Sequence, residues 1–295
     1  MNDGILSQVP AAFTRDLCGY RADSGKPNTS DSNDELSVEL GHALFDELGV
    51  PIGTPPPIDP GTDMEHKIVA CLRELRPDLR IERSRPASDF AQYAHLDVFP
   101  QFRKNFGDLR PALADLTAQV LAADLGSTRA RIEQNLERLA LSTQQQTSLV
   151  ENLAEQMPEE SLLKIDISVA IPQEGQLDEL AVALSSKWSL RTDRAQDCVS
   201  QGHKLVAQRR GRMPHFGVIT IEPRPAMLRI LADGSGAVDF VYHLDLPSLS
   251  AAIDDVASRR SSRWSPRRTF GRLLRQHRLR DFDQLLCEVS RVPGP

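Results

Sequence analysis

The chain has 295 residues, of which 40% are hydrophobic, and a formal net charge of −6. Such a chain can bury one large core or two small ones, and its net negative charge argues against a protein that coats nucleic acid indiscriminately. No apolar run approaches the ~20 residues that span a bilayer, and the four cysteines form no Cys-x-x-Cys pair. We therefore expect a soluble, cytoplasmic protein. A single domain is expected over 1–295, with an irregular N-terminal arm over about 1–60 and a basic, helical C-terminal tail over about 255–295.

Apolar residues recur at helical spacing in three segments of the first half of the chain. These segments predict helices over 36–48, 64–75 and most of 109–157, although the polar tract 142–147 weakens the pattern in the third. Two further segments are expected to be loops, because 21–35 is almost purely polar and 51–63 contains five prolines.

The second half of the chain carries patterns that are typical of β-strands. Strands are expected over 162–171, 181–188, 216–222, 227–231 and 238–244. The last two would form a hairpin across residues 233–236, and a helix is expected over 194–210. The order of elements predicts an α/β or α+β fold, in which helices flank a central sheet.

Alternation along the first two strands suggests a chemical site. In the first strand Ile165 and Ile167 share one face, which leaves Asp166 on the other, and in the second strand Ser185 and Lys187 share a face. If these strands are neighbours, Asp166 and Lys187 come together. A carboxylate that holds a divalent cation and an ammonium that stabilises negative charge suit phosphodiester hydrolysis. The alternative is an ordinary strand-edge aspartate and a surface lysine.

Glu65 lies on the same helical face as Ile68, Val69 and Leu72. A carboxylate on a buried face needs a partner, so Glu65 is a candidate for the same site. Equally, it could sit in the first turn of its helix, where a negative charge favours the helix dipole.

A basic segment follows the lysine. Residues 187–212 hold seven lysines and arginines against two aspartates. Arg191 and Arg194 could each donate two hydrogen bonds to guanine, while Asp193 could accept one from cytosine, so the cluster could read G·C pairs. The alternative is a surface ion-pair cluster worth ~0–1 kcal/mol.

Three motifs lie between residues 185 and 223. They are Ser185-x-Lys187-Trp188-x-x-Arg191-x-Asp193-Arg194-Ala195-Gln196, Gly211-Arg212-x-Pro214-His215 and Val218-x-Thr220-x-Glu222-Pro223. These motifs resemble those of NgoMIV-type restriction endonucleases. The resemblance runs from about Glu65 to Leu246 and implies the PD-(D/E)XK nuclease fold, with a central mixed sheet flanked by helices. It further implies a type II restriction endonuclease that cuts palindromic double-stranded DNA containing CCGG.

By this resemblance, Asp166 is a metal-binding carboxylate, Lys187 the catalytic lysine and Glu65 an additional upstream acid. Ser185 stands where most members of the superfamily have an acid, and the backbone carbonyl of Ser186 is a further metal ligand. Arg191, Asp193 and Arg194 match the residues that read the CCGG core. The implied cofactor is Mg²⁺. The implied partners are DNA, further copies of the chain in a homodimer or homotetramer, and a companion DNA methyltransferase.

The chain departs from the family pattern at three places. Gln201 replaces the carboxylate of the helix after the lysine, and an amide is a poorer magnesium ligand; Asp197, one turn earlier, could substitute for it. Met227 replaces the arginine that reads the outer base pair. Candidates for that contact are Arg224 and Arg229, which flank Met227, and the N-terminal acids Asp23 and Asp31. Ile165 replaces the proline before the first catalytic aspartate.

The preferred interpretation is a magnesium-dependent endonuclease for a CCGG-core palindrome, with GCCGGC as the expected site. Two alternatives remain: a sequence-specific DNA-binding protein whose catalysis Gln201 has weakened, and a DNA-repair nuclease of the same fold. Nine arginines between 259 and 280 could contact phosphates or form a solvated surface.

Overall fold

The computed structural model describes residues 9–98, 108–123, 126–156, 163–233 and 236–295. The contacts divide the chain into two compact units. The first combines Met1–Ala94 with Leu163–Pro295 and holds the sheet, whereas the second is His95–Leu162. No helix among the described residues is long and apolar enough to cross a membrane.

A mixed sheet of six strands forms the centre of the first unit, in the order β1-β2-β3-β4-β5-β6. Its strands are β1 (Arg80–Pro86), β2 (Lys164–Ile171), β3 (Glu179–Lys187), β4 (His215–Thr220), β5 (Phe240–His243) and β6 (Leu279–Asp281). The first three strands pair antiparallel, and β3 through β6 pair parallel. This arrangement confirms the expected α/β class with a mixed sheet flanked by helices.

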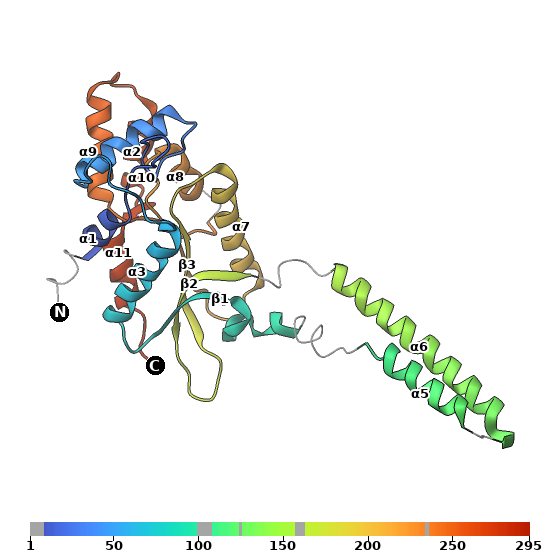
Figure 1. The fold of residues 1–295 in the computed structure, drawn as a ribbon. Helices are drawn as coiled ribbons and strands as arrows, with labels where there is room; N and C mark the ends of the chain where they lie inside the picture. Colours follow the sequence, from blue (N-terminus) through green and yellow to red (C-terminus); the bar gives the residue numbers. More distant parts are fainter. Residues whose placement is uncertain (1–8, 99–107, 124–125, 157–162, 234–235) are drawn as a thin grey trace. The chain divides into compact units, whose positions relative to one another are not determined.

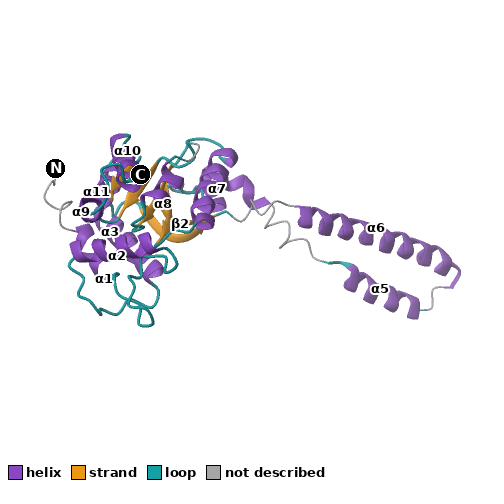
Figure 2. Cartoon of the chain, turned by 90° about the horizontal axis from the view of Figure 1, so that it is seen from above, coloured by secondary structure: helices purple, strands orange, loops and turns teal. Residues whose placement is uncertain are grey.

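The helices of this unit lie on both sides of the sheet, with α3 on one side and α7 on the other (Figure 1). They are α1 (Val9–Asp16), α2 (Glu35–Glu47), α3 (Pro60–Leu75), α7 (Thr192–Gln208), α8 (Pro225–Ala232), α9 (Leu246–Ser258), α10 (Ser265–Arg275) and α11 (Phe282–Ser290). Short 3-10 turns follow β1 at Ala87–Asp89 and Ala91–Asp97. Seen from above, the helices surround the strands (Figure 2).

Local chemistry explains where α3 and α7 lie. The side chain of Asp59 accepts a hydrogen bond from the Thr62 amide at 3.0 Å and so caps α3 at its N-terminus. In α7, Gly202 faces the sheet, and a Cβ atom there would lie 2.8 Å from the ring of Phe216. The glycine therefore permits the close approach of α7 to β4.

The segment expected to be a strand at 227–231 is instead part of α8, so that prediction is wrong. Pro225 occupies the first turn of the helix, where its missing N–H costs nothing, and Leu228 and Leu231 are buried at helical spacing. The expected hairpin is also wrong, because β5 pairs in parallel with β4 and β6. Residues 234 and 235 of the expected turn lie outside the described part of the chain.

Two helices form most of the second unit: α5 (Arg110–Ala122) and α6 (Arg129–Gln156), with a 3-10 turn at Gly126–Thr128 before α6. They lie side by side in both Figure 1 and Figure 2. The polar tract 142–147 is helical throughout. This polar tract can be part of the helix because Thr143 and Thr147 are buried, and the Thr147 hydroxyl donates a hydrogen bond to the Thr143 carbonyl at 2.9 Å.

Candidate active site

Asp166 and Lys187 meet across neighbouring strands, as the alternation predicted. Asp166 lies on β2 and Lys187 ends β3, and these strands pair antiparallel. The Lys187 ammonium donates to Oδ2 of Asp166 at 2.8 Å, with both side chains about one quarter exposed at 26% and 25%. The pair is therefore a partly open contact within reach of a ligand.

Two further donors reach the same carboxylate oxygen. The Ser185 hydroxyl lies 3.1 Å from Oδ2 of Asp166, and the backbone amide of Ser186 lies 2.9 Å from it. Three consecutive residues of β3 thus donate to one atom of β2. Among the described residues, the second oxygen of Asp166 accepts no hydrogen bond, so it remains available to a ligand.

The environment keeps Lys187 charged. Burial works against the charged form of the ammonium, but the charge of Asp166 and the hydrogen bond to it outweigh burial, so the pKa of Lys187 is raised. A cationic side chain is thereby held beside the free oxygen of Asp166. That placement suits stabilisation of a negative charge.

Glu65 belongs to the same neighbourhood. Burial raises the pKa of its carboxyl group, the negative charge of Asp166 adds to that rise, and Lys187 opposes it. Its Oε2 atom accepts hydrogen bonds from Nε and Nη2 of Arg83 at 2.9 and 2.6 Å. Arg83 also contacts His66. The arginine is thus the partner that a carboxylate on an apolar helix face requires.

Arg83 was missed in the sequence because the charge-rich stretch Arg80–Pro86 does not look like a strand. The next residue, Ser84, has a φ angle of 57°, in a region that non-glycine residues rarely adopt. The pairing with β2 keeps the same register on both sides of Ser84, since Arg83 pairs with Ile167 and Arg85 with Ile165. Backbone outliers of this kind cluster at functional sites.

Gln201 lies near this cluster without joining it. Its side-chain amide on α7 donates to the backbone carbonyl of Lys164 on β2 at 2.6 Å. Asp197, one turn earlier on α7, is exposed. Between them Cys198 is buried, with its sulfur 3.4 Å from the Ser185 hydroxyl. Thus Cys198 of α7 contacts Ser185, one of the residues that donate a hydrogen bond to Asp166. The sequence alone had not indicated a role for Cys198.

The donor chemistry of this neighbourhood fits a hard divalent cation. Oxygen ligands from carboxylates are what such ions prefer, and Asp166 and Glu65 each offer one oxygen that accepts no hydrogen bond from the described residues. Within the described part of the chain, no group of three or more His, Cys, Asp or Glu side chains has the geometry of a metal site. The cluster thus presents two carboxylates, Asp166 and Glu65, and a complete metal shell would need further oxygen ligands from neighbouring groups or water.

A fixed connector follows the lysine. The indole of Trp188 donates to the carbonyl of Asn28 at 3.2 Å, and the amide of Leu190 donates to Glu222 at 2.8 Å. The carbonyl of Leu190 accepts from Arg224. Both ends of the three-residue link between Lys187 and Arg191 are therefore held by buried hydrogen bonds.

The predicted base-reading residues open the next helix. Arg191 precedes the first turn of α7, and Asp193 and Arg194 lie within it, all three exposed. Arg191 and Arg194 line a polar cavity of about 340 Å³ together with residues of the N-terminal segment. The other lining residues are Arg21, Ser30, Asp31, Ser32, Asn33, Ser189 and Leu190.

The candidates for an outer contact differ in their surroundings. Asp31 lines the cavity, while Asp23 and Arg229 are exposed elsewhere on the surface. Arg224, expected as a base-reading residue, is instead buried, with its side chain only 7% exposed. It is bound by Glu222 at 2.6 Å and by Asp34 at 3.1 Å. This burial and these partners favour a structural role for Arg224 over a base contact.

The arginine-rich C-terminal segment is largely engaged within the protein. Six of its nine arginines have acidic or carbonyl partners: Arg259, Arg260, Arg267, Arg272, Arg278 and Arg280. Arg263, Arg268 and Arg275 have no ion pair with the described residues. Most of these arginines thus already have a partner within the protein, and three are left for an external anion.

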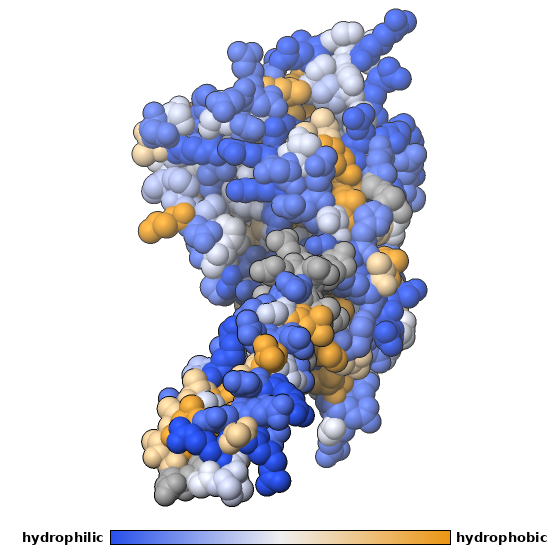
Figure 3. Space-filling model, turned by 90° about the vertical axis from the view of Figure 1, so that its right-hand side faces the viewer, coloured by the Kyte–Doolittle hydropathy of each residue, from blue (hydrophilic) through white to orange (hydrophobic). Residues whose placement is uncertain are grey.

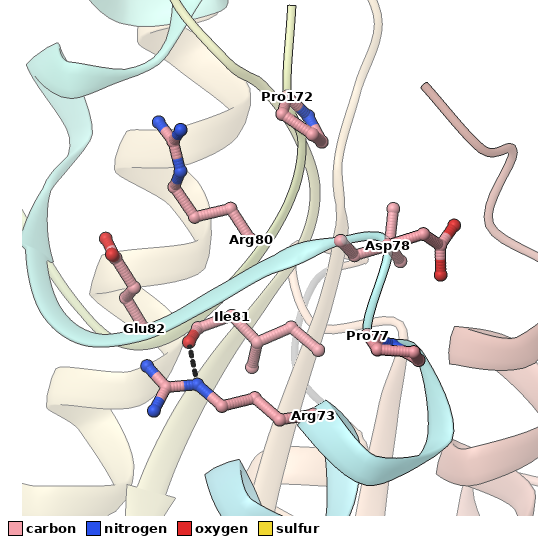
Figure 4. Close-up of a pocket in the computed structure, with 8 residues that line it drawn as sticks. Arg73, Pro77, Asp78, Arg80, Ile81, Glu82 and Pro172 are labelled. Atoms are coloured by element: carbon pink, nitrogen blue, oxygen red, sulfur yellow. Dashed lines mark hydrogen bonds between the residues drawn. The ribbon is translucent and has the colours of Figure 1, made fainter.

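A separate, open pocket of about 500 Å³ lies at the start of β1, between the end of α3 and Pro172 (Figure 4). Arg73 lines it and donates to the carbonyl of Ile81 at 2.8 Å. Neither Asp166 nor Lys187 borders this pocket. It is therefore distinct from the carboxylate and lysine cluster.

Comparison with known proteins places this site in a family. The model of the family described as NgoMIV restriction enzyme matches residues 80–290, which is more than half of the chain. The chain belongs to the NgoMIV restriction enzyme family. A curated relative, the type II restriction enzyme NgoMIV of Neisseria gonorrhoeae, is 40% identical over 82 residues, which cover 28% of this chain and 29% of the relative. The match to the NgoMIV family includes Asp166, Lys187 and Arg191 but begins after Glu65.

Proposed function

We propose that this protein is a type II restriction endonuclease that hydrolyses double-stranded DNA at a palindrome with a CCGG core, GCCGGC being the expected site. The observation that carries the proposal is the convergence of Ser185, Ser186 and Lys187 on Asp166, followed four residues after the lysine by Arg191. Family membership supports the reaction class. The products would be 5′-phosphate and 3′-hydroxyl ends.

In this proposal Asp166 and Glu65 hold a magnesium ion, with the Ser186 carbonyl and either Gln201 or Asp197 as further ligands. The chemistry supplied by a magnesium ion bound there would be activation of a water molecule and polarisation of the scissile phosphate. Ser185 and the Ser186 amide orient the Asp166 carboxylate. Lys187, kept charged by Asp166, places its ammonium where the phosphate gains negative charge.

Recognition is assigned to the start of α7. Arg191 and Arg194 donate to guanine and Asp193 accepts from cytosine, which together read the core. Asp31 lines the same cavity as Arg191 and Arg194, which supports Asp31 over Asp23 as the N-terminal acid of the site. Arg229 and Asp23 remain candidates for the outer base pair or its backbone.

A palindrome is read by two copies related by a two-fold axis. We therefore assign a homodimer at minimum, with a homotetramer as the larger assembly. A host that makes such an endonuclease needs a companion DNA methyltransferase that protects its own sites.

The decisive experiment incubates a plasmid of known sequence with purified protein and millimolar magnesium, then maps the cleaved ends. Discrete fragments that end at every CCGG-core palindrome of one type support the proposal. Cleavage at lesions or mismatches would instead indicate a repair nuclease. Cleavage at unrelated sequences would contradict the assigned recognition.

A second candidate is a DNA-binding protein with weakened catalysis. The specific observation in its favour is Gln201, whose neutral side-chain amide donates a hydrogen bond to the carbonyl of Lys164. Binding of a CCGG duplex without cleavage at any magnesium concentration would establish it.

A further inference from the structure

The hairpin of α5 and α6 leaves an apolar groove open along one side. Leu109, Ala112, Leu113 and Leu116 line the groove from the α5 side, and Leu139 and Thr143 from α6, around a cavity of about 240 Å³. The leucines at its rim are strongly exposed, Leu109 at 64%, Leu116 at 49% and Leu139 at 50%. We call these six residues the hairpin groove.

The hairpin has little core of its own. No residue of α5 is buried, although most of its residues are leucine, alanine or valine. Small units of fewer than about 70–80 residues rarely bury enough apolar surface to be stable without a staple or an assembly partner. Apolar residues also reach the surface in separate patches on the face shown in Figure 3. A partner that covers the groove would supply the missing core.

The charges around the groove indicate what the partner is. From Leu139 to Val150 α6 carries no charged residue, and between Pro111 and Ala122 α5 carries only Asp115. Depletion of charge is typical of the centre of protein interfaces. DNA is a poor fit, because binding to phosphates needs lysine or arginine and none of the six residues that line the groove is either.

A face that meets its own copy around a two-fold axis places each residue near itself or its neighbours. Such a face cannot carry a block of like charge. The hairpin groove satisfies this condition, since all six residues that line it are leucine, alanine or threonine. Two helical hairpins packed along their apolar sides make a four-helix bundle, a common and stable arrangement.

We propose that the hairpin groove is a self-association surface, and that two copies of this chain join their α5–α6 hairpins into a four-helix bundle. The inference deepens the proposed function and rests on it for the need for more than one copy. It assigns to the second unit a role in assembly rather than in catalysis.

The test measures the mass of the full-length protein in solution without DNA, by light scattering after size-exclusion chromatography. Wild-type protein is expected as a dimer or tetramer. Leu139→Glu and Leu139→Lys, each prepared alone, should halve that mass, because two like charges would face each other across the axis. Mixing the two variants should restore it, because opposite charges would then meet.

The matched control is Gln134→Glu. Gln134 is also exposed on α6, but five residues of helix turn it away from Leu139, so its mass should equal that of the wild type. Circular dichroism confirms that every variant keeps its helical content. Leu116→Glu tests the α5 side of the groove in the same way.

A single-chain mass for the wild type, an unchanged mass for Leu139→Glu, or failure of the mixture to reassemble would each overturn the proposal. An unchanged mass would mean that the groove is covered by another part of the same chain or by a different partner. The plasmid assay is independent of this measurement, so a protein that assembles through the hairpin but cuts no DNA would contradict the proposed function alone.

Discussion

Arg83 directs two of its nitrogens at a single oxygen of Glu65, at 2.9 and 2.6 Å, and leaves the other oxygen of that carboxylate free of hydrogen bonds from the described residues. Such a contact fixes the orientation of the free oxygen. The arginine therefore acts as a positioning residue for Glu65, which is one of the two carboxylates proposed to hold magnesium.

Replacing Arg83 should raise the magnesium concentration that cleavage requires. We expect Arg83→Gln to raise the magnesium concentration for half-maximal cleavage by about 10–100-fold, the usual cost of losing a group that orients a metal ligand. Arg83→Lys should recover part of the loss. Cleavage rates over a magnesium titration measure the effect.

The control is Arg80→Gln, since Arg80 lies on the same strand but pairs with Asp178 at 2.7 Å. It should leave the magnesium titration unchanged. Equal effects of Arg80→Gln and Arg83→Gln would show that any loss of charge on β1 disturbs the enzyme, and would remove the specific role of Arg83.

Lys187→Ala should slow cleavage by about 10²–10³-fold, because the variant loses a charge aimed at the developing negative charge. Binding to a cognate duplex, measured with calcium in place of magnesium, should change little. Lys164→Ala serves as the control: that lysine is exposed on β2, and its carbonyl still accepts from Gln201. Comparable loss of cleavage in both variants would argue against a catalytic ammonium.

Gln201→Glu should lower the magnesium requirement, because a carboxylate would join the cation site. The variant should also lose some folding stability, because it cannot donate a hydrogen bond to the Lys164 carbonyl, and such a bond is typically worth about 0.5–1.5 kcal/mol. Thermal unfolding should therefore shift downwards slightly while the magnesium titration shifts to lower concentrations. A titration identical to that of the wild type would remove Gln201 from the metal shell.

Arg224 and Arg191 should behave in opposite ways. Arg224→Ala leaves Glu222 buried without its partner, which typically costs about 3–5 kcal/mol of folding free energy. Arg191→Ala removes an exposed group, so stability should hold while binding to a CCGG duplex weakens by about 1–3 kcal/mol. Denaturant unfolding and duplex titrations measure the two effects. A stable Arg224→Ala protein with lost binding would return Arg224 to the base-reading residues.

Two buried groups should oppose each other as the pH falls. Burial lowers the pKa of His243 to about 4, so acidification from pH 6.5 to 4 protonates the unfolded chain first and costs stability. Burial raises the pKa of Asp281 to about 6, so acidification through that value protonates the folded chain first and adds stability. The two contributions largely cancel in the wild type.

In the Asp281→Asn variant, the loss of folding stability that His243 causes on acidification should become visible. Asparagine still accepts from the amides of Leu246 and Phe282, at 3.1 and 2.9 Å, but it does not titrate. Between pH 6.5 and 4 the variant should therefore lose about 1–3 kcal/mol more stability than the wild type. The exposed Asp254→Asn is the control. Parallel stability curves for Asp281→Asn and the wild type would contradict the opposing titrations.

The sequence alone predicted the elements that its alternation and spacing define clearly. Asp166 and Lys187 could be paired because both lie on strands whose apolar faces are unambiguous. The short run Met227–Leu231 could not be resolved by period alone, and Pro225 two residues earlier was the signal for a helix. The strand holding Arg83 was hidden because its charged residues are satisfied by partners distant in sequence, Glu65 and Asp178.

The role of Arg224 was also beyond the sequence. The position of Arg224 beside Met227 suggested a contact with the outer base pair. The partners of its buried guanidinium, Glu222 and Asp34, are brought together only by the fold. The same holds for several arginines of the C-terminal segment, since Arg260 pairs with Glu39, Arg267 with Asp254 and Arg272 with Asp233. Local charge counts cannot distinguish an arginine that awaits phosphate from one already paired.

The connector Trp188–Leu190 has a consequence for fidelity. Because hydrogen bonds to Asn28, Glu222 and Arg224 hold it at both ends, the offset between Lys187 and Arg191 is set by the protein and not by the DNA. If Arg191 reads a base pair as proposed, a wrong base pair at that position would shift the duplex and move the scissile phosphate away from the Lys187 ammonium. Discrimination against near-cognate sites would then appear as slow cleavage as well as weak binding.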